Sequence, residues 1–236
     1  MAIHKDFPSS PHEILKPEVR WFPADESLRD TSYEKLMPPL VPELRKAVEK
    51  WRVDGYPDIS NTSKTLLNHW FNTPHPIIHA DGTTSNFQYY FAQREAVETI
   101  IYLHEAVKVA DKYDLLRFSK SDAVSAQLFE ETWRRYVVKM ATGSGKTKTM
   151  SLILAWSYFH RKYEERSDLS KNFLVIAPNI IVLDRLRNDF DGLRIFAEDP
   201  VIPSNGVDGK NWKSDFQLTL HIQDKVGPIN PRGNIF

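Results

Sequence analysis

The sequence of 236 residues contains no cysteine. This absence excludes disulfide bonds, thiol nucleophiles and cysteine-ligated metal centres. The sequence also has no apolar run near the roughly 18 residues that a membrane-spanning helix requires, and its first residues lack the apolar core of a secretory signal. These absences predict a cytoplasmic protein without a membrane segment.

Neither sign of charge dominates the chain. Lys and Arg number 31, Asp and Glu also number 31, and the formal net charge is zero. A protein that holds nucleic acid through its bulk charge is basic, so any DNA contact has to come from locally placed groups. Apolar residues are not scarce: 41% of the chain is hydrophobic and 12% is aromatic, which suffices for a sizeable core.

Glycine is scarce, with 9 residues, whereas proline has 15. Most of the prolines lie before residue 80, and their density interrupts regular structure. We therefore expect residues 1–80 to form a proline-rich accessory arm of irregular segments and short helices, with helices near residues 42–51 and 62–71. A different pattern begins in residues 81–236.

Helices and strands alternate in this second region. Apolar spacing predicts helices over residues 91–110, 146–165 and 180–190. Short apolar or alternating runs predict strands over residues 136–140, 172–177 and 217–223. Such alternation is typical of a parallel sheet with right-handed crossovers. We predict an α/β domain over residues 81–236 with a parallel sheet flanked by helices.

A glycine-containing loop joins the first of these strands to the next helix, with the sequence Met140-Ala141-Thr142-Gly143-Ser144-Gly145-Lys146-Thr147. Glycines let backbone amides curl closely around a polyphosphate, and the helix N-terminus adds aligned donors. The Lys146 ammonium suits the β- and γ-phosphates, and the Thr147 hydroxyl suits Mg²⁺. Met140 stands where the usual motif has its first glycine. The loop predicts ATP binding, with Lys146 and Thr147 as the catalytic residues.

The predicted ligands of ATP form one continuous run. They are Thr142, Gly143, Ser144, Gly145, Lys146, Thr147 and Lys148, with Mg²⁺ held through Thr147. Residues 180–184, Ile-Ile-Val-Leu-Asp, imitate a strand that delivers an acidic magnesium ligand. They follow the preceding predicted strand too closely for a parallel crossover, which needs a dozen or more residues, so we predict a helix there.

No other apolar strand of this sequence ends in two acidic residues. The last four residues, Gly233-Asn234-Ile235-Phe236, begin an apolar run that looks interrupted within a strand. We therefore expect a fragment of a longer protein in which the acidic magnesium ligands follow further along the chain. Such a fragment would bind nucleotide weakly and turn it over negligibly.

Three segments in order resemble superfamily 2 helicases. Phe91-Ala92-Gln93-Arg94-Glu95-Ala96 is similar to their adenine-reading Q motif, and the loop at 140–147 is similar to motif I. Residues 173–179, which end in Ala177-Pro178-Asn179, are similar to motif Ia. From about Trp51 onward the sequence resembles the helicase (Res) subunits of type III restriction enzymes.

The resemblance implies the first of two RecA-like domains that close on ATP and translocate along DNA. It implies that Gln93 bonds the adenine edge and that Pro178 and Asn179 contact the DNA backbone. It also implies a modification or specificity subunit as a partner. Motif II, the second RecA-like domain and a nuclease module are missing from this sequence.

Other interpretations of the same residues stay open. Gln93 also suits an ordinary helix start, and Asn179 also suits a helix cap. A small-molecule phosphotransferase would need lid arginines, and residues 192–236 hold only Arg194 and Arg232. A non-catalytic interaction module with a vestigial loop is the third possibility, against which the intact Lys146 and its neighbouring threonine argue.

Overall fold

A computed structural model describes residues 40–119, 135–222 and 225–236 of the chain. Residues 1–39, which make up half of the predicted accessory arm, lie outside the described residues. The chain divides into two compact units: Met1–Gly55 with Lys108–Tyr136, and Tyr56–Val107 with Val137–Phe236. The second unit contains the glycine loop and is therefore the one that positions the site.

In the first unit, helix α2 spans Val41–Val53, with a proline in its first turn and with Val48 and Trp51 buried. This confirms the helix predicted near residues 42–51. The short helix α5 (Lys112–Leu115) continues into a 3₁₀ turn, η4 (Leu116–Phe118).

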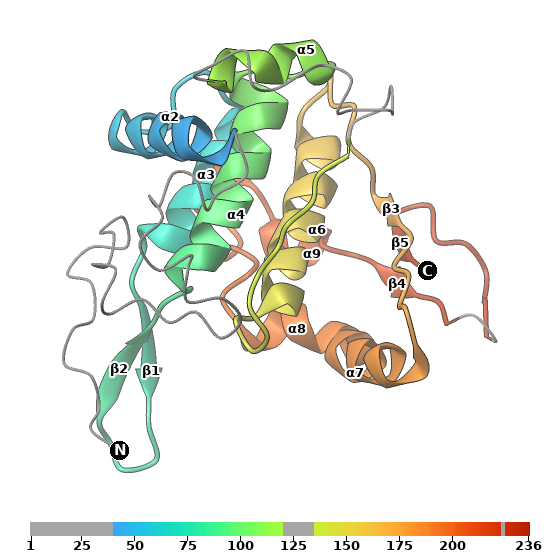
Figure 1. Ribbon diagram of the computed structural model, residues 1–236. Coiled ribbons are helices and arrows are strands. Elements are labelled where there is room, and N and C mark those ends of the chain that lie inside the picture. The colour runs from blue at the N-terminus through green and yellow to red at the C-terminus, as the bar shows by residue number, and fades with distance from the viewer. Residues whose placement is uncertain (1–39, 120–134, 223–224) are drawn as a thin grey trace, which may run out of the picture. The chain divides into compact units, whose positions relative to one another are not determined.

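Three helices form the body of the second unit. They are α3 (Asn61–Phe71), α4 (Phe91–Ile101) and α6 (Lys146–Tyr163), and they pack side by side (Figure 1). Helices α4 and α6 confirm the helices predicted from apolar spacing over residues 91–110 and 146–165, and α3 confirms the short helix predicted near residues 62–71. A π-helical turn, η3 (Tyr102–Ala106), extends α4, and the helix then ends short of the predicted residue 110. Lys108 has a φ of 54°, a left-handed backbone conformation that cannot continue a right-handed helix.

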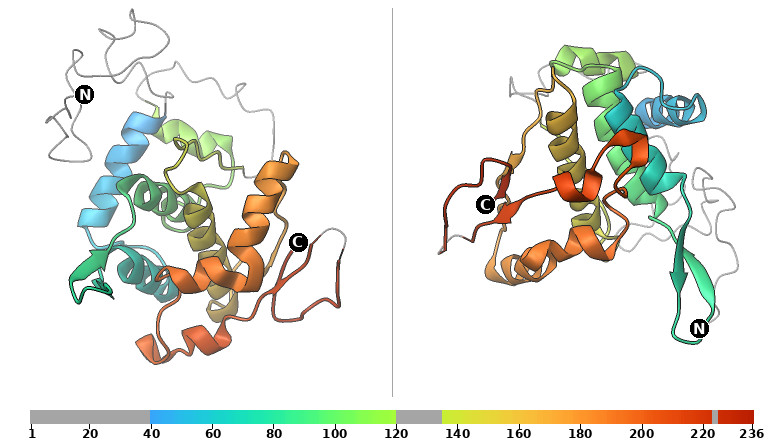
Figure 2. Two further views of the ribbon diagram at one scale, coloured as in Figure 1. Left: turned by 90° about the horizontal axis from the view of Figure 1, so that it is seen from below. Right: turned by 180° about the vertical axis from the view of Figure 1, so that it is seen from behind.

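An aromatic cluster covers the C-terminal half of α6. Trp212 of α9 (Trp212–Asp215) is fully buried, and its ring centroid lies 4.8 Å from that of Phe159 and 5.2 Å from that of Tyr163. Seen from behind, α9 crosses α6 at this point (Figure 2). Edge-to-face aromatic packing of this kind adds to the burial of the rings. Helix α8 (Arg194–Glu198) also packs on α6.

The sheet of the second unit is parallel, as predicted, but small. Its strands β3 (Asn172–Phe173), β5 (Asn234–Ile235) and β4 (Thr219–Leu220) lie in that order. The amide of Asn234 links all three strands: its Nδ2 donates to Asn172 Oδ1 at 2.8 Å, and its Oδ1 lies 2.8 Å from His221 Nε2. The described residues thus show a mixed helix and sheet architecture.

A hairpin of strands β1 (His75–Ile78) and β2 (Thr84–Phe87) was not predicted. The prolines at its start suggested irregular structure, although one of them stands within β1. The boundary predicted near residue 80 falls at the tip of this hairpin. Both sides of that predicted boundary therefore belong to the same compact unit.

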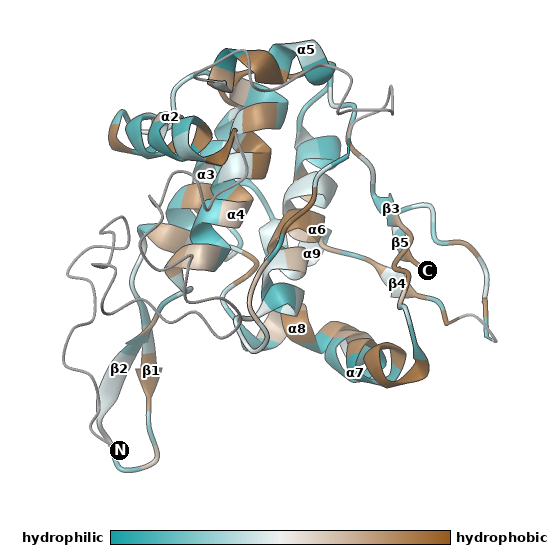
Figure 3. Ribbon diagram, in the orientation of Figure 1, coloured by the Kyte–Doolittle hydropathy of each residue, from teal (hydrophilic) through white to brown (hydrophobic). Residues whose placement is uncertain are grey.

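One sequence prediction of a buried strand is wrong, and a second is only partly confirmed. No strand is assigned over residues 136–140, where the side chain of Val137 is 84% exposed. The strand predicted over 172–177 is limited to its first two residues, and Leu174 and Ile176 are 72% and 79% exposed. Figure 3 shows these apolar segments on the path into α6 and next to α7. A strand is buried only where neighbouring elements cover it, and none of the described residues covers these side chains.

Helix α7 spans Ile180–Phe190, as predicted. The side chain of Asn179 caps it by accepting from Val182 N at 3.0 Å. Residues 180–184 are therefore not a strand that delivers an acidic ligand. No helix of the described part is long and apolar enough to span a bilayer.

A half-buried carboxylate, that of Glu105, connects η3 to the start of α3. Glu105 accepts hydrogen bonds from Ser60 N and from Ser63 Oγ, and His160 Nε2 lies 3.4 Å from its Oε1. Burial raises the pKa of Glu105, but the hydrogen bonds from His160, Ser63 and Ser60 outweigh it and lower that pKa from 4.5 to about 2. The folded state therefore favours the charged form of this carboxyl group.

This network makes stability depend on pH. Because the folded pKa of Glu105 lies below the unfolded value of 4.5, its contribution is complete above pH 4.5 and is lost as the pH falls toward 2. We expect Glu105→Gln to lower the free energy of unfolding at pH 7 by roughly 2–3 kcal/mol. Urea unfolding should show the gap between variant and wild type narrowing below pH 4.5. If the difference in free energy of unfolding between wild type and Glu105→Gln stayed constant down to about pH 2.5, this account would be contradicted.

Candidate functional site

The glycine loop forms a tight turn directly before α6. Gly143 and Gly145 both have a φ of 81°, in the left-handed region that a side chain disfavours. Ser144 N donates to Ala141 O at 3.3 Å, and Ser144 Oγ donates to the same oxygen at 2.7 Å. These bonds close the turn, so that the chain enters α6 at Lys146 with its first amides directed out of the helix end.

The first amides of α6 supply hydrogen-bond donors. Thr149 N is the first to reach back, to Gly145 O at 3.0 Å, whereas the N–H groups of Gly145, Lys146 and Thr147 have no acceptor among the described residues. Lys146 Nζ lies across the loop and donates to Ala141 O at 2.8 Å. Free amides, a helix N-terminus and one ammonium group form an arrangement that suits a phosphate group.

The loop opens on a cavity of about 240 Å³. Its lining comes from the loop, α6, α7 and the end of α8: Gly145, Thr147, Lys148, Asp189, Ile195, Glu198 and Asp199. The described residues contain no group of three or more His, Cys, Asp or Glu side chains that could hold a metal by itself. A magnesium ion beside the Thr147 hydroxyl therefore needs phosphate oxygens and water as further ligands, as Mg²⁺ takes in most phosphate sites. The residues present fit a metal that arrives with a nucleotide.

The ammonium group of Lys148 is paired with Asp199, and both residues line the same cavity as Gly145 and Thr147. Lys148 Nζ lies 2.6 Å from Asp199 Oδ2 and 5.4 Å from the ring centroid of Phe87 on β2. The sequence predicts Lys148 as a nucleotide ligand, and that role stays a prediction, because Lys148 lines the cavity while its ammonium group pairs with Asp199. Asp199 was not foreseen, because no motif marks it and it is 51 residues away along the chain.

Gln93 lies behind the loop rather than in the cavity. It is the third residue of α4, it is 2% exposed, and its Nε2 donates to Ser144 O at 3.0 Å. Its Oε1 accepts from Tyr90 N at 2.9 Å. The structure thus brings Gln93 and the loop together, as the order of the motifs suggests, although both ends of the amide are occupied by the main chain.

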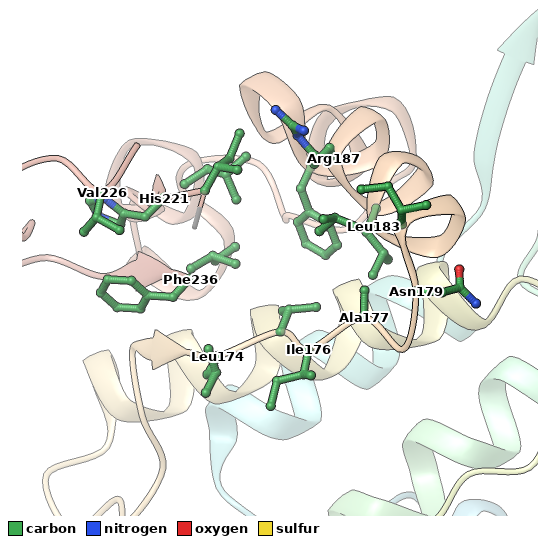
Figure 4. A pocket seen from close by; sticks show the side chains of 16 residues that line it. Leu174, Ile176, Ala177, Asn179, Leu183, Arg187, His221, Val226 and Phe236 are labelled. Atoms are coloured by element: carbon green, nitrogen blue, oxygen red, sulfur yellow. The ribbon is translucent and has the colours of Figure 1, made fainter. Parts of the chain in front are cut away.

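The segment with Pro178 and Asn179 lies at a separate cavity of about 620 Å³ between α7 and the sheet. Figure 4 shows Leu174, Ile176, Leu183 and Phe236 around it. This lining is mostly apolar, although it includes Arg187 and His221, and the side chain of Asn179 caps α7. Contact of Pro178 and Asn179 with DNA stays a prediction. The cavity was not foreseen, because its apolar residues were assigned to buried strands.

Comparison with known proteins gives one match. A family model described as "Type III restriction enzyme, res subunit" matches residues 86–226, more than half of the chain. The matched region begins in β2 and contains α4, the glycine loop, α6, α7 and β4. No functionally curated protein and no solved structure gives a match.

Proposed function

We propose, from the premise that this chain belongs to the type III restriction enzyme res subunit family, that its glycine loop binds the phosphates of ATP together with Mg²⁺. The chain is then the ATP-binding part of an ATP-dependent DNA helicase or translocase of a type III restriction or related defence system. Its architecture is that of a partial RecA-like P-loop domain.

One observation carries this proposal: the N–H groups of Gly145, Lys146 and Thr147 have no acceptor among the described residues, and Gly145 and Thr147 line one cavity. Neutral amides, a helix N-terminus and a lysine stabilise the charge of a triphosphate without a large basic surface. This accounts for a phosphate site in a chain whose net charge is zero. The family match spans the loop and supports a helicase-like role for it.

Each predicted residue has a defined task in this proposal. Lys146 exchanges its bond to Ala141 O for the β- and γ-phosphates, and the Thr147 hydroxyl becomes a ligand of the Mg²⁺ that the nucleotide brings. The amides of residues 142–148 hold the remaining phosphate oxygens. Pro178 with Asn179 meets the DNA backbone, whereas both ends of the Gln93 amide are engaged by the main chain rather than by adenine. A modification subunit is the proposed protein partner.

Nucleotide binding by the purified chain tests the proposal. We expect saturable binding of fluorescent N-methylanthraniloyl-ATP in Mg²⁺, competed by ATP and by inorganic tripolyphosphate, because the loop contacts phosphate rather than ribose. Chelation of Mg²⁺ should weaken binding. Binding that tripolyphosphate does not compete would overturn the phosphate site.

The DNA part of the proposal has its own readout. We expect labelled duplex DNA to bind the same chain, measured by anisotropy, with an affinity that falls as salt rises. A chain that binds triphosphate but no DNA would keep the nucleotide assignment and remove the DNA-motor assignment.

A further inference from the structure

We propose that Gln93 is a positioning residue that locks the Ser144–Gly145 peptide with its N–H directed at the phosphate. This role rests on the proposed nucleotide site and differs from recognition of adenine. Through this role, a residue at the start of α4 supports phosphate binding by the glycine loop.

The first step is that the Gln93 amide has a single orientation. Its Oε1 accepts from Tyr90 N at 2.9 Å and its Nε2 donates to Ser144 O at 3.0 Å. A flipped amide would place its oxygen against the Ser144 oxygen and its NH₂ against the Tyr90 N–H, which loses both bonds. The side chain is 2% exposed, so water cannot replace them. Gln93 is therefore held as a fixed donor toward Ser144 O.

The second step follows from peptide geometry. The described chain has no cis peptide bond, and in a trans peptide the C=O and the following N–H point in opposite directions. Because Ser144 C=O points at Gln93, the N–H of Gly145 points away from Gln93. That N–H has no acceptor among the described residues, and Gly145 lines the 240 Å³ cavity together with Thr147. The bond to Ser144 therefore fixes the direction of one phosphate donor.

The third step is that this peptide needs a lock. Glycine flanks Ser144 on both sides, and both glycines have positive φ, so rotation of the peptide plane meets little steric resistance. Gln93 also packs directly on the loop: a Cβ at Gly145 would lie 2.1 Å from its Nε2. The same glycine that permits the turn also makes room for Gln93. Without the Nε2 donor, the Ser144–Gly145 peptide would be free to rotate, and the Ser144 carbonyl rather than the Gly145 N–H would then face the phosphate.

Gln93→Glu isolates this bond. A glutamate at the third position of a helix still accepts from Tyr90 N, so the cap of α4 is retained. The ionised carboxylate cannot donate to Ser144 O and repels it. We expect the variant to lose about tenfold or more in affinity for inorganic tripolyphosphate, ATP and GTP alike, measured by competition against fluorescent ATP in Mg²⁺. The thermal midpoint should fall at neutral pH, because the new carboxylate is buried without a counter-charge, so affinities are compared at a temperature at which both proteins are folded.

Lowering the pH should restore triphosphate binding by the same variant. As the pH falls through the pKa of the carboxyl group that the substitution introduces, this group regains an O–H that donates to Ser144 O. The ratio of the tripolyphosphate affinity of Gln93→Glu to that of the wild type, both measured at the same pH, should then rise toward one. A ratio that does not change with pH counts against the lock.

The outcomes separate the two hypotheses. If Gln93→Glu binds tripolyphosphate as the wild type does but loses its preference for ATP over GTP, Gln93 reads adenine and the lock is overturned. If the wild type binds no triphosphate, the proposed function itself fails. Should the variant not fold, the amide resonance of Gly145 in the wild type decides the question. A large shift on addition of tripolyphosphate supports the lock, and no shift overturns it.

Discussion

Lys146→Ala is expected to lower the affinity for Mg²⁺-ATP at least about a hundredfold while the chain stays folded. A charge-assisted hydrogen bond to phosphate contributes roughly 3 kcal/mol, and each 1.4 kcal/mol is a factor of ten. The Lys146 side chain is exposed and bonds the carbonyl of Ala141, which water reaches when the lysine is removed. The substitution therefore removes phosphate charge rather than core packing.

The neighbouring Lys148 is the matched control. It is the same residue type two positions along α6, but its ammonium group pairs with Asp199. We expect Lys148→Ala to cost much less nucleotide affinity and to lower the thermal midpoint, because Asp199 is only 10% exposed and is left without this partner. Fluorescent ATP titrations and thermal unfolding of both variants check this. A larger affinity loss for Lys148→Ala than for Lys146→Ala would show that the wrong lysine had been assigned to the phosphates.

The second large effect is expected on stability, from Arg94→Ala. Arg94 Nε donates to Glu98 Oε1 at 2.7 Å, and Tyr56 Oη donates to the same oxygen at 2.6 Å. Glu98 is fully buried. Removal of the guanidinium group leaves a buried carboxylate without this counter-charge, which costs about 3–5 kcal/mol. Burial and the adjacent Glu98 also raise the pKa of Tyr56, so its phenol stays a donor and cannot supply charge.

Two companion variants test the cause. Tyr56→Phe removes the hydrogen bonds of the phenol with Glu98 and with Arg94 but keeps the ion pair, and it should cost about 2–3 kcal/mol. Glu98→Gln in the Arg94→Ala background removes the stranded charge and should recover part of the loss. Urea unfolding gives all three free energies. If Arg94→Ala unfolds at the urea concentration of the wild type, this ion pair does not stabilise the fold.

The local features of this protein follow from its sequence. Helices α4, α6 and α7 lie where apolar spacing predicts them, because a helix closes its hydrogen bonds between residues four apart. The turn at Gly143 and Gly145 and the start of α6 at Lys146 are equally local. Residues 142–147 therefore identify a candidate phosphate loop without any knowledge of the fold.

The sheet shows where the sequence is insufficient. The apolar side chains of residues 136–140 and 172–177 suit a buried strand. A strand also has to pair with another strand, however, and the partner strand comes from a distant part of the chain. The order β3-β5-β4 and the exposure of Leu174 and Ile176 depend on which segments meet. No local pattern contains that information.

By itself, the sequence determined the loop, its lysine and threonine, and the helix that follows, because each depends on residues a few positions apart. Only the tertiary structure decided that Gln93 bonds Ser144 from 51 residues away and that Asp199 pairs with Lys148. These contacts join segments that the chain brings together only when α4, α6 and α8 pack, and their hydrogen bonds and ion pairs depend on that packing geometry.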